Sequence, residues 1–192
     1  METDDAIFVE RAQGGDSEAF RVLVERYSQR LFRVAWRILG EEASAEDAVQ
    51  ETFLRAYRAL PRFDARSQFG TWLHRIAANT SIEILRKRQR QRQESQEQAD
   101  TPSGEPGPDR RALSLEVDRA VREALAGLSP LERAAFVLRH YEERSIAEVC
   151  DTLGLRENAG KQAVFRAVKK LRRVLEPLTS RRAPASSHEV VL

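Results

Sequence analysis

The sequence contains a single cysteine, Cys150, among its 192 residues, so it cannot form an internal disulfide framework. No stretch approaches the roughly 20 consecutive apolar residues that are needed to cross a bilayer. The acidic amino terminus lacks the cationic start and apolar run of a secretory signal. We therefore expect a cytoplasmic protein without membrane insertion.

Glycine and proline are also scarce, with nine and seven residues, and no run alternates apolar with polar residues as a half-buried strand does. Good helix formers are abundant instead. Residues 91–112 contain three prolines, two glycines and almost nothing apolar, which is typical of a flexible linker. The sequence thus predicts an all-α fold with two small helical domains, 1–90 and 113–177, joined by the linker 91–112 and followed by a disordered tail, 178–192.

Capping residues and glycines indicate where helices begin and end in the first half of the chain. We expect helices over residues 5–13, 17–39, 44–60 and from about 67 onward. Asp16 or Ser17 can cap the second, and Gly40 can close it. In the third, Ser44 with Asp47 three residues later forms a capping-box pattern.

The outer face of the 44–60 segment gathers acidic and polar side chains around a leucine: Asp47, Gln50, Glu51 and Leu54. An exposed leucine by itself needs no explanation. Beside two carboxylates, however, Leu54 is able to anchor a contact with a basic protein partner. The residues alone leave both interpretations open, a solvated helix face or a partner site.

Residues 61–92 carry eight cations against two acids, which the whole-chain charge of +2 conceals. Phe63, Phe69 and Trp72 lie between these cations, and flat rings beside basic groups suit the stacking of unpaired bases and contact with phosphate. Helical spacing places Trp72, Arg75, Asn79 and Arg86 on one flank, beside an apolar stripe that should face the core. The alternative is that Trp72 only widens this stripe and that the cations are a solvated face.

The second half begins with a helix marked by Val117, Val121, Leu125 and Leu128. Ser129 and Ser145 each start a capping-box pattern, and Gly154 makes a turn before a basic helix that runs from Asn158 to about Leu175. A short helix, a glycine turn and a longer basic helix are the order of a helix-turn-helix. We expect a helix-turn-helix domain of four helices.

The outward side of the last helix and its approach is rich in polar and basic residues: Arg156, Lys161, Gln162, Phe165, Arg166 and Lys169. Gln162 and Arg166 have side chains that can read base edges, whereas the other cations suit phosphates. Any basic amphipathic helix shares part of this pattern, so a solvated face remains the alternative.

Four segments carry a resemblance to a known family: AEDAVQETFLRAYRAL (45–60), FGTWLHRIAANTSIEILRKR (69–88), SIAEVCDTLGL (145–155) and KQAVFRAVKKLR (161–172). In this order, around a proline-rich linker, they resemble the extracytoplasmic function (ECF) sigma factors. These compact bacterial initiation factors bring RNA polymerase to promoters. The resemblance covers residues 7–176.

The resemblance implies three binding surfaces. Asp47, Gln50, Glu51 and Leu54 would bind the clamp helices of the RNA polymerase core. The −10 promoter element, including a flipped base, would be held by Phe63, Asp64, Ser67, Trp72, Arg75 and Asn79, with Arg86, Lys87 and Arg90 on phosphate. The −35 element would be read by Arg156, Lys161, Gln162, Phe165, Arg166 and Lys169. An anti-sigma factor is a further expected partner.

Three residues depart from the family pattern. Cys150 stands where the family usually has a small alanine, and we interpret it as a buried, inert thiol, with a redox sensor as the alternative. Gly160 lies in the first turn of the recognition helix, which it should weaken or bend. His74 replaces a residue that is often tyrosine, and we interpret it as a substitution on the DNA-side surface.

An enzyme and a regulator that acts without polymerase are the two other functional classes. An enzyme is disfavoured because the three histidines have no spacing typical of a metal site or catalytic triad, and no phosphate-binding glycine loop is present. We expect no catalytic residue, metal or cofactor. An ordinary helix-turn-helix regulator that acts without polymerase explains residues 145–175 but gives the Asp47 face and the Trp72 flank no role.

Overall fold

The computed structural model describes residues 2–64, 68–96 and 124–180, with side chains described for 5–64, 68–91 and 124–176. These parts of the chain are helical and contain no strand, which confirms the all-α prediction. The helices of the first half are α1 (Glu2–Gln13), α2 (Ser17–Leu39), α3 (Glu42–Ala59) and α4 (Phe69–Gln96), with a short 3₁₀ turn, η1 (Leu60–Arg62). Those of the second half are α6 (Pro130–His140), α7 (Ile146–Leu153) and α8 (Glu157–Ser180).

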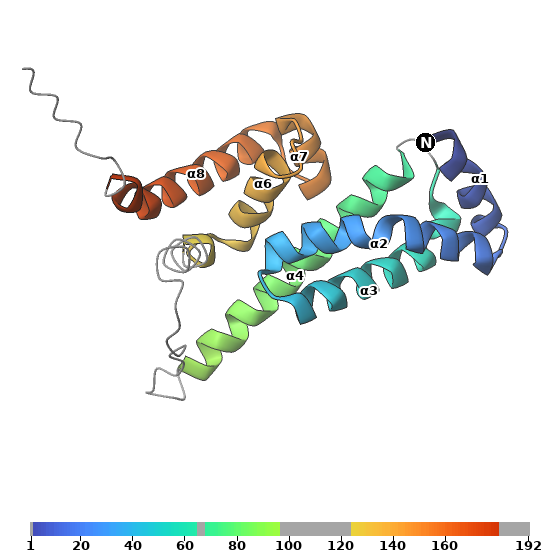
Figure 1. Cartoon of the computed structure of the whole chain (residues 1–192), viewed down its shortest axis with the longest axis horizontal. Coiled ribbons are helices and arrows are strands. Elements are labelled where there is room, and N and C mark those ends of the chain that lie inside the picture. Colours follow the sequence, from blue (N-terminus) through green and yellow to red (C-terminus); the bar gives the residue numbers. More distant parts are fainter. Residues whose placement is uncertain (1, 65–67, 97–123, 181–192) are drawn as a thin grey trace, which may run out of the picture.

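In the first domain, α2, α3 and α4 pack against one another, and α1 packs beside η1 at one end (Figure 1). Leucines from α2, η1 and α4 fill the centre of this bundle, and Leu23, Leu31, Leu60 and Leu73 are completely buried. Burial of each such side chain contributes about 1.5–3 kcal/mol to folding. This core fixes which faces of α3 and α4 remain available to partners.

The predicted ends of α2 are confirmed. Asp16 Oδ1 accepts hydrogen bonds from the backbone N–H groups of Glu18 and Ala19, at 3.0 and 3.1 Å. At the other end Gly40 has a φ of 72°, a left-handed conformation that glycine adopts without strain.

The predicted start of α3 is wrong, because the helix begins at Glu42 and not at Ser44. Ser44 is buried within the first turn, and its hydroxyl donates to Glu41 Oε2 at 3.0 Å. Packing against the core therefore determines the position of Ser44, which does not form the capping box with Asp47.

The long helix α4 also differs from the prediction, because it continues through residues 91–96 of the predicted linker. Glutamine and arginine are abundant there and favour a helix that extends into solvent. The rest of the predicted linker lies outside the described residues, as do most of the predicted 117–128 helix and residues 181–192 of the predicted tail.

The second domain forms the predicted helix-turn-helix. Ser129 Oγ accepts from the Glu132 N–H at 3.2 Å while Glu132 Oε2 accepts from the Ser129 N–H at 2.9 Å, and the pair at Ser145 and Glu148 repeats this capping box. Gly154, at φ 65°, makes the turn between α7 and α8. The last helix starts one residue before Asn158 and runs past Leu175 to Ser180.

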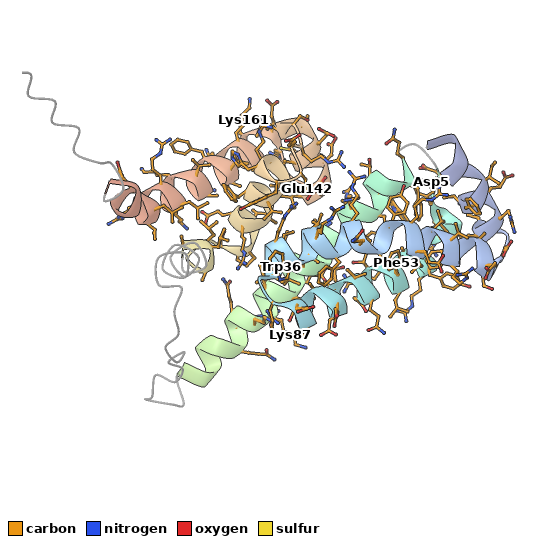
Figure 2. All side chains as sticks on the ribbon, viewed as in Figure 1. Asp5, Trp36, Phe53, Lys87, Glu142 and Lys161 are labelled. Atoms are coloured by element: carbon orange, nitrogen blue, oxygen red, sulfur yellow. The ribbon has the colours of Figure 1, made fainter. Side chains whose placement is uncertain are left out.

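The two domains share a hydrophobic core, a contact that the sequence analysis did not anticipate. Residues of α2 and α4 form one buried cluster with residues of α6, α7 and α8: Val34, Ile38, Ala78, Ile82, Ala134, Ala135, Val137, Leu138, Val149, Leu153 and Ala163. At the edge of this contact, Arg37 Nη1 donates to Glu142 Oε1 at 2.7 Å, and the Arg37 guanidinium lies 4.9 Å from the ring centroid of Tyr141. Figure 2 shows Glu142 at the side of the second domain that faces α2.

The recognition helix approaches α7 closely because residue 160 is a glycine. A Cβ at Gly160 would overlap the Sγ of Cys150, and that thiol is buried, as the sequence predicted. The larger side chain at 150 and the missing side chain at 160 therefore compensate each other.

We expect Gly160→Ala to destabilise the protein by about 1–3 kcal/mol because of this overlap. In a Cys150→Ala background the overlap disappears, and the same change should stabilise α8 by up to about 1 kcal/mol through better helix propensity. Urea unfolding of the parent, the two single variants and the double variant measures the coupling. Equal effects of Gly160→Ala in both backgrounds would contradict the proposed compensation.

Candidate partner and nucleic-acid interfaces

The structure places Asp47, Gln50, Glu51 and Leu54 together on the outer face of α3. Asp47, Gln50 and Leu54 are exposed, and 46% of the leucine surface is accessible. Glu51 is half-buried. Glu51 accepts a hydrogen bond from Arg55 Nε at 2.7 Å, and Arg55 also donates to Glu83 of α4 at 2.7 Å. The four predicted residues thus form one continuous surface, with Leu54 as its apolar member.

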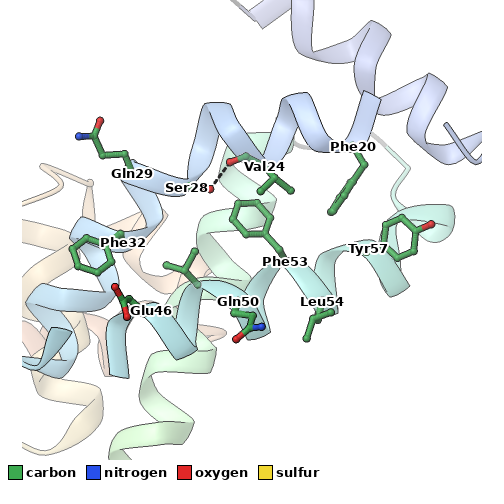
Figure 3. Close-up of a pocket in the computed structure, with 11 residues that line it drawn as sticks. Phe20, Val24, Ser28, Gln29, Phe32, Glu46, Gln50, Phe53, Leu54 and Tyr57 are labelled. Atoms are coloured by element: carbon green, nitrogen blue, oxygen red, sulfur yellow. Dashed lines mark hydrogen bonds between the residues drawn. The ribbon is translucent and has the colours of Figure 1, made fainter. Parts of the chain in front are cut away.

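An open apolar groove of about 760 Å³ lies beside this surface, between α2 and α3 (Figure 3). Its lining is mainly aromatic and aliphatic, from Phe20, Val24, Phe32, Val49, Phe53 and Tyr57, and Gln50 and Leu54 also contribute. The Phe20 ring stands edge-on to the rings of Phe53 and Tyr57, with centroids 6.4 and 5.0 Å apart. Such a groove can receive apolar side chains of a partner helix.

Sequence reasoning missed this groove. Helical spacing favours buried positions for Phe20, Val24, Val49 and Phe53, whereas the structure leaves all four only half-buried. One signal in the sequence could have predicted the groove. The apolar stripes of α2 and α3 are wider than the stripe that one helix needs for packing against the core.

At the start of α4, three aromatic rings form a cluster. The Phe63 and Trp72 centroids are 4.8 Å apart, and Phe69 lies 5.6 Å from Trp72 and 5.9 Å from Phe63. Gln13 Nε2 supports the loop before α4 by donating to the carbonyls of Leu60 and Phe63, at 3.0 and 2.7 Å. Trp72 is therefore held by its neighbours while part of its ring remains accessible.

The flank predicted to contact a single strand is continuous along α4. Arg75 is exposed and Asn79 half-buried, one and two turns beyond Trp72. Arg86, Lys87 and Arg90 are exposed farther along the same helix, and Asp64 is exposed in the loop. Ser67 lies outside the described residues.

The prediction that His74 lies on a DNA-side surface is wrong. Only 4% of its surface is accessible, because its side of α4 faces α2 and the second domain. Its Nδ1 is 2.7 Å from the carbonyl oxygen of Gly70, and burial lowers the pKa of its imidazole. The ring borders a cleft of about 370 Å³ that is also lined by Leu138 and Arg144.

The predicted recognition face of α8 is assembled on one side of the helix. Lys161, Gln162, Phe165, Arg166 and Lys169 are all exposed, Arg156 is exposed just before the helix, and 65% of Phe165 is accessible. A hydrogen bond to Glu157 raises the pKa of Lys161, which stays cationic. An exposed aromatic among cations is well suited to an apolar contact with a thymine methyl group.

Glu132 of α6 supports this face from behind. Its side chain is nearly buried, and it pairs with Lys170 Nζ at 2.7 Å and lies 3.7 Å from Arg166 Nε. Burial raises the pKa of Glu132, but the hydrogen bonds from Lys170 and from the Ser129 N–H outweigh this effect and leave the pKa below its usual value. The carboxylate is therefore charged and orients two cations of α8.

Within the described ranges, no group of three or more His, Cys, Asp or Glu residues is arranged to hold a metal ion. Over the same ranges, no helix combines the length and apolar character that crossing a membrane requires. What the described site offers is binding surface: an apolar groove with an acidic rim, an aromatic and cationic flank, and a recognition helix.

Comparison with known proteins identifies the family of both domains. Residues 23–91 match the family Sigma-70 region 2, and residues 118–171 match Sigma-70, region 4. The RNA polymerase sigma-H factor of Pseudomonas aeruginosa is 32% identical over 183 residues, covering 91% of this chain and 95% of the relative. The ECF RNA polymerase sigma factor SigW of Bacillus subtilis is 29% identical over 179 residues, covering 88% and 96%.

Two solved structures have the same architecture. CnrH, in complex with the cytosolic domain of CnrY, matches with a TM-score of 0.64 and 30% identity, over 90% of this chain and 97% of CnrH. The sigma factor RpoE of Bartonella quintana, in complex with the anti-sigma factor NepR, matches with a TM-score of 0.60 and 26% identity, over 82% and 96%.

Proposed function

Because this chain belongs to the ECF sigma factors, which bind RNA polymerase and direct promoter-specific initiation, we propose that each of its three surfaces has a separate role in that process. The observation that carries the proposal is that one small domain presents two exposed surfaces. One is the Leu54 face of α3, made of Asp47, Gln50, Glu51 and Leu54, and the other is the Trp72 flank of α4. A helix-turn-helix regulator without polymerase would need neither surface.

The Leu54 face of α3 is the proposed contact with the polymerase clamp helices. Asp47 and Glu51 supply negative charge, Gln50 can hydrogen-bond, and Leu54 supplies an apolar anchor. The neighbouring groove extends the apolar area that a helical partner can cover. Charge complementarity then directs the approach, and burial of the leucine adds to the affinity.

The Trp72 flank is the proposed site for the melted −10 element. Extruding a base costs a few kcal/mol, and stacking on an aromatic ring returns about 1–3 kcal/mol per base. Phe63 and Trp72 are preorganised by mutual packing, so little freedom is lost on binding. Asp64, Ser67, Arg75 and Asn79 are proposed to contact the captured bases, and Arg86, Lys87 and Arg90 the phosphates.

The recognition helix α8 is the proposed reader of the −35 element and sets the register of the complex. We assign Gln162, Phe165 and Arg166 to base edges and Arg156, Lys161 and Lys169 to phosphates. RNA synthesis belongs to the polymerase, and we infer no catalytic role for this chain and a cytoplasmic site of action. The solved relatives bound to CnrY and NepR support an anti-sigma factor as a further partner.

Transcription from a promoter tests this function directly. Purified bacterial core polymerase should initiate at a cognate promoter only when this chain is added, and the chain should copurify with the core. A regulator without a polymerase role would instead bind duplex DNA alone and leave core polymerase unable to select the promoter. That second result would reject the proposed function.

Substitutions in α8 should separate base reading from phosphate binding. In the holoenzyme, Gln162→Ala should cost about 1–3 kcal/mol on the cognate −35 sequence and little on scrambled DNA. Lys169→Ala should weaken binding to both sequences and reduce the slope of log affinity against log salt by about one.

Fluorescence anisotropy over a salt series measures both effects. Arg21→Ala, which removes an exposed cation of α2, is the control and should change neither. If Gln162→Ala weakens both sequences equally, the side chain does not read bases.

A further inference from the structure

His74 is buried at the point where α4 meets the second domain. The ring borders the cleft between α4 and α7, which Trp72 and Arg75 line from one side and Arg144, Glu148 and Asp151 from the other. The cleft therefore joins the proposed −10 flank to the first helix of the helix-turn-helix. Separating the domains would uncover the histidine and the side of Trp72 that lines the cleft.

The hydrogen bonds of His74 show which protonation state the contact accommodates. The Gly70 carbonyl can only accept, so Nδ1 must carry the proton and donate to it at 2.7 Å. Nε2 is then a bare acceptor, and it is buried without a hydrogen-bond partner in the structure. Adding a proton there would create a buried N–H⁺ group without an acceptor, which is far more costly than the neutral ring.

The surrounding charges add to this cost or are already paired. Arg30 of α2 and Arg144 of the α6–α7 loop both disfavour a positive ring. Glu142 favours it but forms an ion pair with Arg37, and Glu148 forms one with Arg144 at 2.9 Å. On α4 itself, Arg75 is a further cation lining the cleft.

The α7 side of the cleft contributes two more groups, Asp151 and Cys150. Asp151 lines the cleft and is exposed to solvent, which screens its charge. Cys150 also lines the cleft and is buried, and Glu148 is held by its capping box as well as by Arg144. The balance of these groups disfavours imidazolium in the closed contact.

We propose that His74 is a proton-operated latch between the two domains: neutral His74 permits their contact, and protonation of its Nε2 separates them and uncovers the side of Trp72 that lines the cleft. The open state binds the proton more readily than the closed state. Acidification therefore favours opening, and the closed contact is fully stable only above the ordinary histidine value of about 6.5. This inference concerns the free chain and does not rest on the proposed promoter contacts.

Energy transfer between two dyes on the full chain tests the latch. Cysteines at the exposed positions Arg58 of α3 and Arg173 of α8 carry the dyes, with Cys150→Ser to prevent a third label. As the pH falls from 7.5 to 5.5, the transfer efficiency should change. Below about 6.5 the opening constant should rise by up to about tenfold per pH unit, the limit for one proton.

Two variants remove the titrating group. His74→Phe keeps a flat ring that is never charged, and His74→Gln keeps a neutral polar group, so both should abolish the pH-dependent change. His140→Gln is the matched control, because that histidine is exposed outside the contact and should leave the change intact.

Circular dichroism melting shows whether His74→Phe and His74→Gln fold. If one of them does not fold, the pH dependence of the other variant tests the latch. A pH-independent parent protein would overturn the latch. So would a transition that persists in a folded His74 variant.

Discussion

The double variant Asp47→Lys, Leu54→Asp is expected to lose at least about 100-fold in affinity for core polymerase. An anchor residue at the centre of an interface costs about 2 kcal/mol or more when removed, and a reversed charge adds repulsion of a basic partner. Each 1.4 kcal/mol corresponds to about tenfold in affinity. Titration of labelled variant with purified core polymerase measures the loss, and transcription should fall in parallel.

Ile7→Asp, Glu25→Lys is the matched control for that variant. It makes the same two kinds of change at exposed positions on α1 and α2, with 57% of Ile7 accessible. The control should bind core polymerase as the parent does. Equal losses in the two double variants would show that surface charge in general, and not the α3 face, determines the affinity.

Trp72→Ala is expected to reduce open-complex formation about 10- to 100-fold without changing the affinity for core polymerase. The reason is the loss of about 1–3 kcal/mol of base stacking. Permanganate footprinting of unpaired thymines and the initiation rate both report the effect. Binding of the holoenzyme to a −35 duplex should stay unchanged, because α8 is untouched.

Two further proteins make the tryptophan experiment decisive. Trp36→Ala removes the other tryptophan, which is half exposed on α2, and should initiate as the parent does. Trp72→Phe retains a ring beside Phe63 and should recover a large part of the activity. If Trp72→Phe and Trp72→Ala are equally impaired and equally destabilised in thermal melting, the tryptophan only supports the fold.

Helix boundaries that depend on local hydrogen bonds or on a glycine turn could be predicted from the sequence. The caps at Asp16, Ser129 and Ser145 involve hydrogen bonds to residues two or three positions away, and a glycine turn needs only its own backbone conformation. The start of α3 could not be predicted, because burial of Ser44 depends on helices elsewhere in the chain. Local patterns compete with tertiary packing, and here packing prevails.

The same distinction applies to the candidate site. Helical periodicity correctly groups the Leu54 face, the Trp72 flank and the α8 face, since each lies on one helix. The groove between α2 and α3 and the burial of His74 arise where separate elements meet. A single sequence does not record which helices are neighbours, so an apolar stripe looks the same whether it faces a core or a groove.

The uninterrupted helix α4 fixes the distance between the residues at its two ends. Trp72 and Arg90 lie on this one continuous helix, and at a rise of 1.5 Å per residue they are separated by about 27 Å along its axis. At 3.4 Å per base pair this equals about eight steps along a duplex. Helix geometry thereby fixes the distance between the proposed strand-capture site at Trp72 and the proposed phosphate contact at Arg90. Inserting a single residue into α4 would rotate its two ends by about 100° relative to each other and misalign these two sites on one promoter.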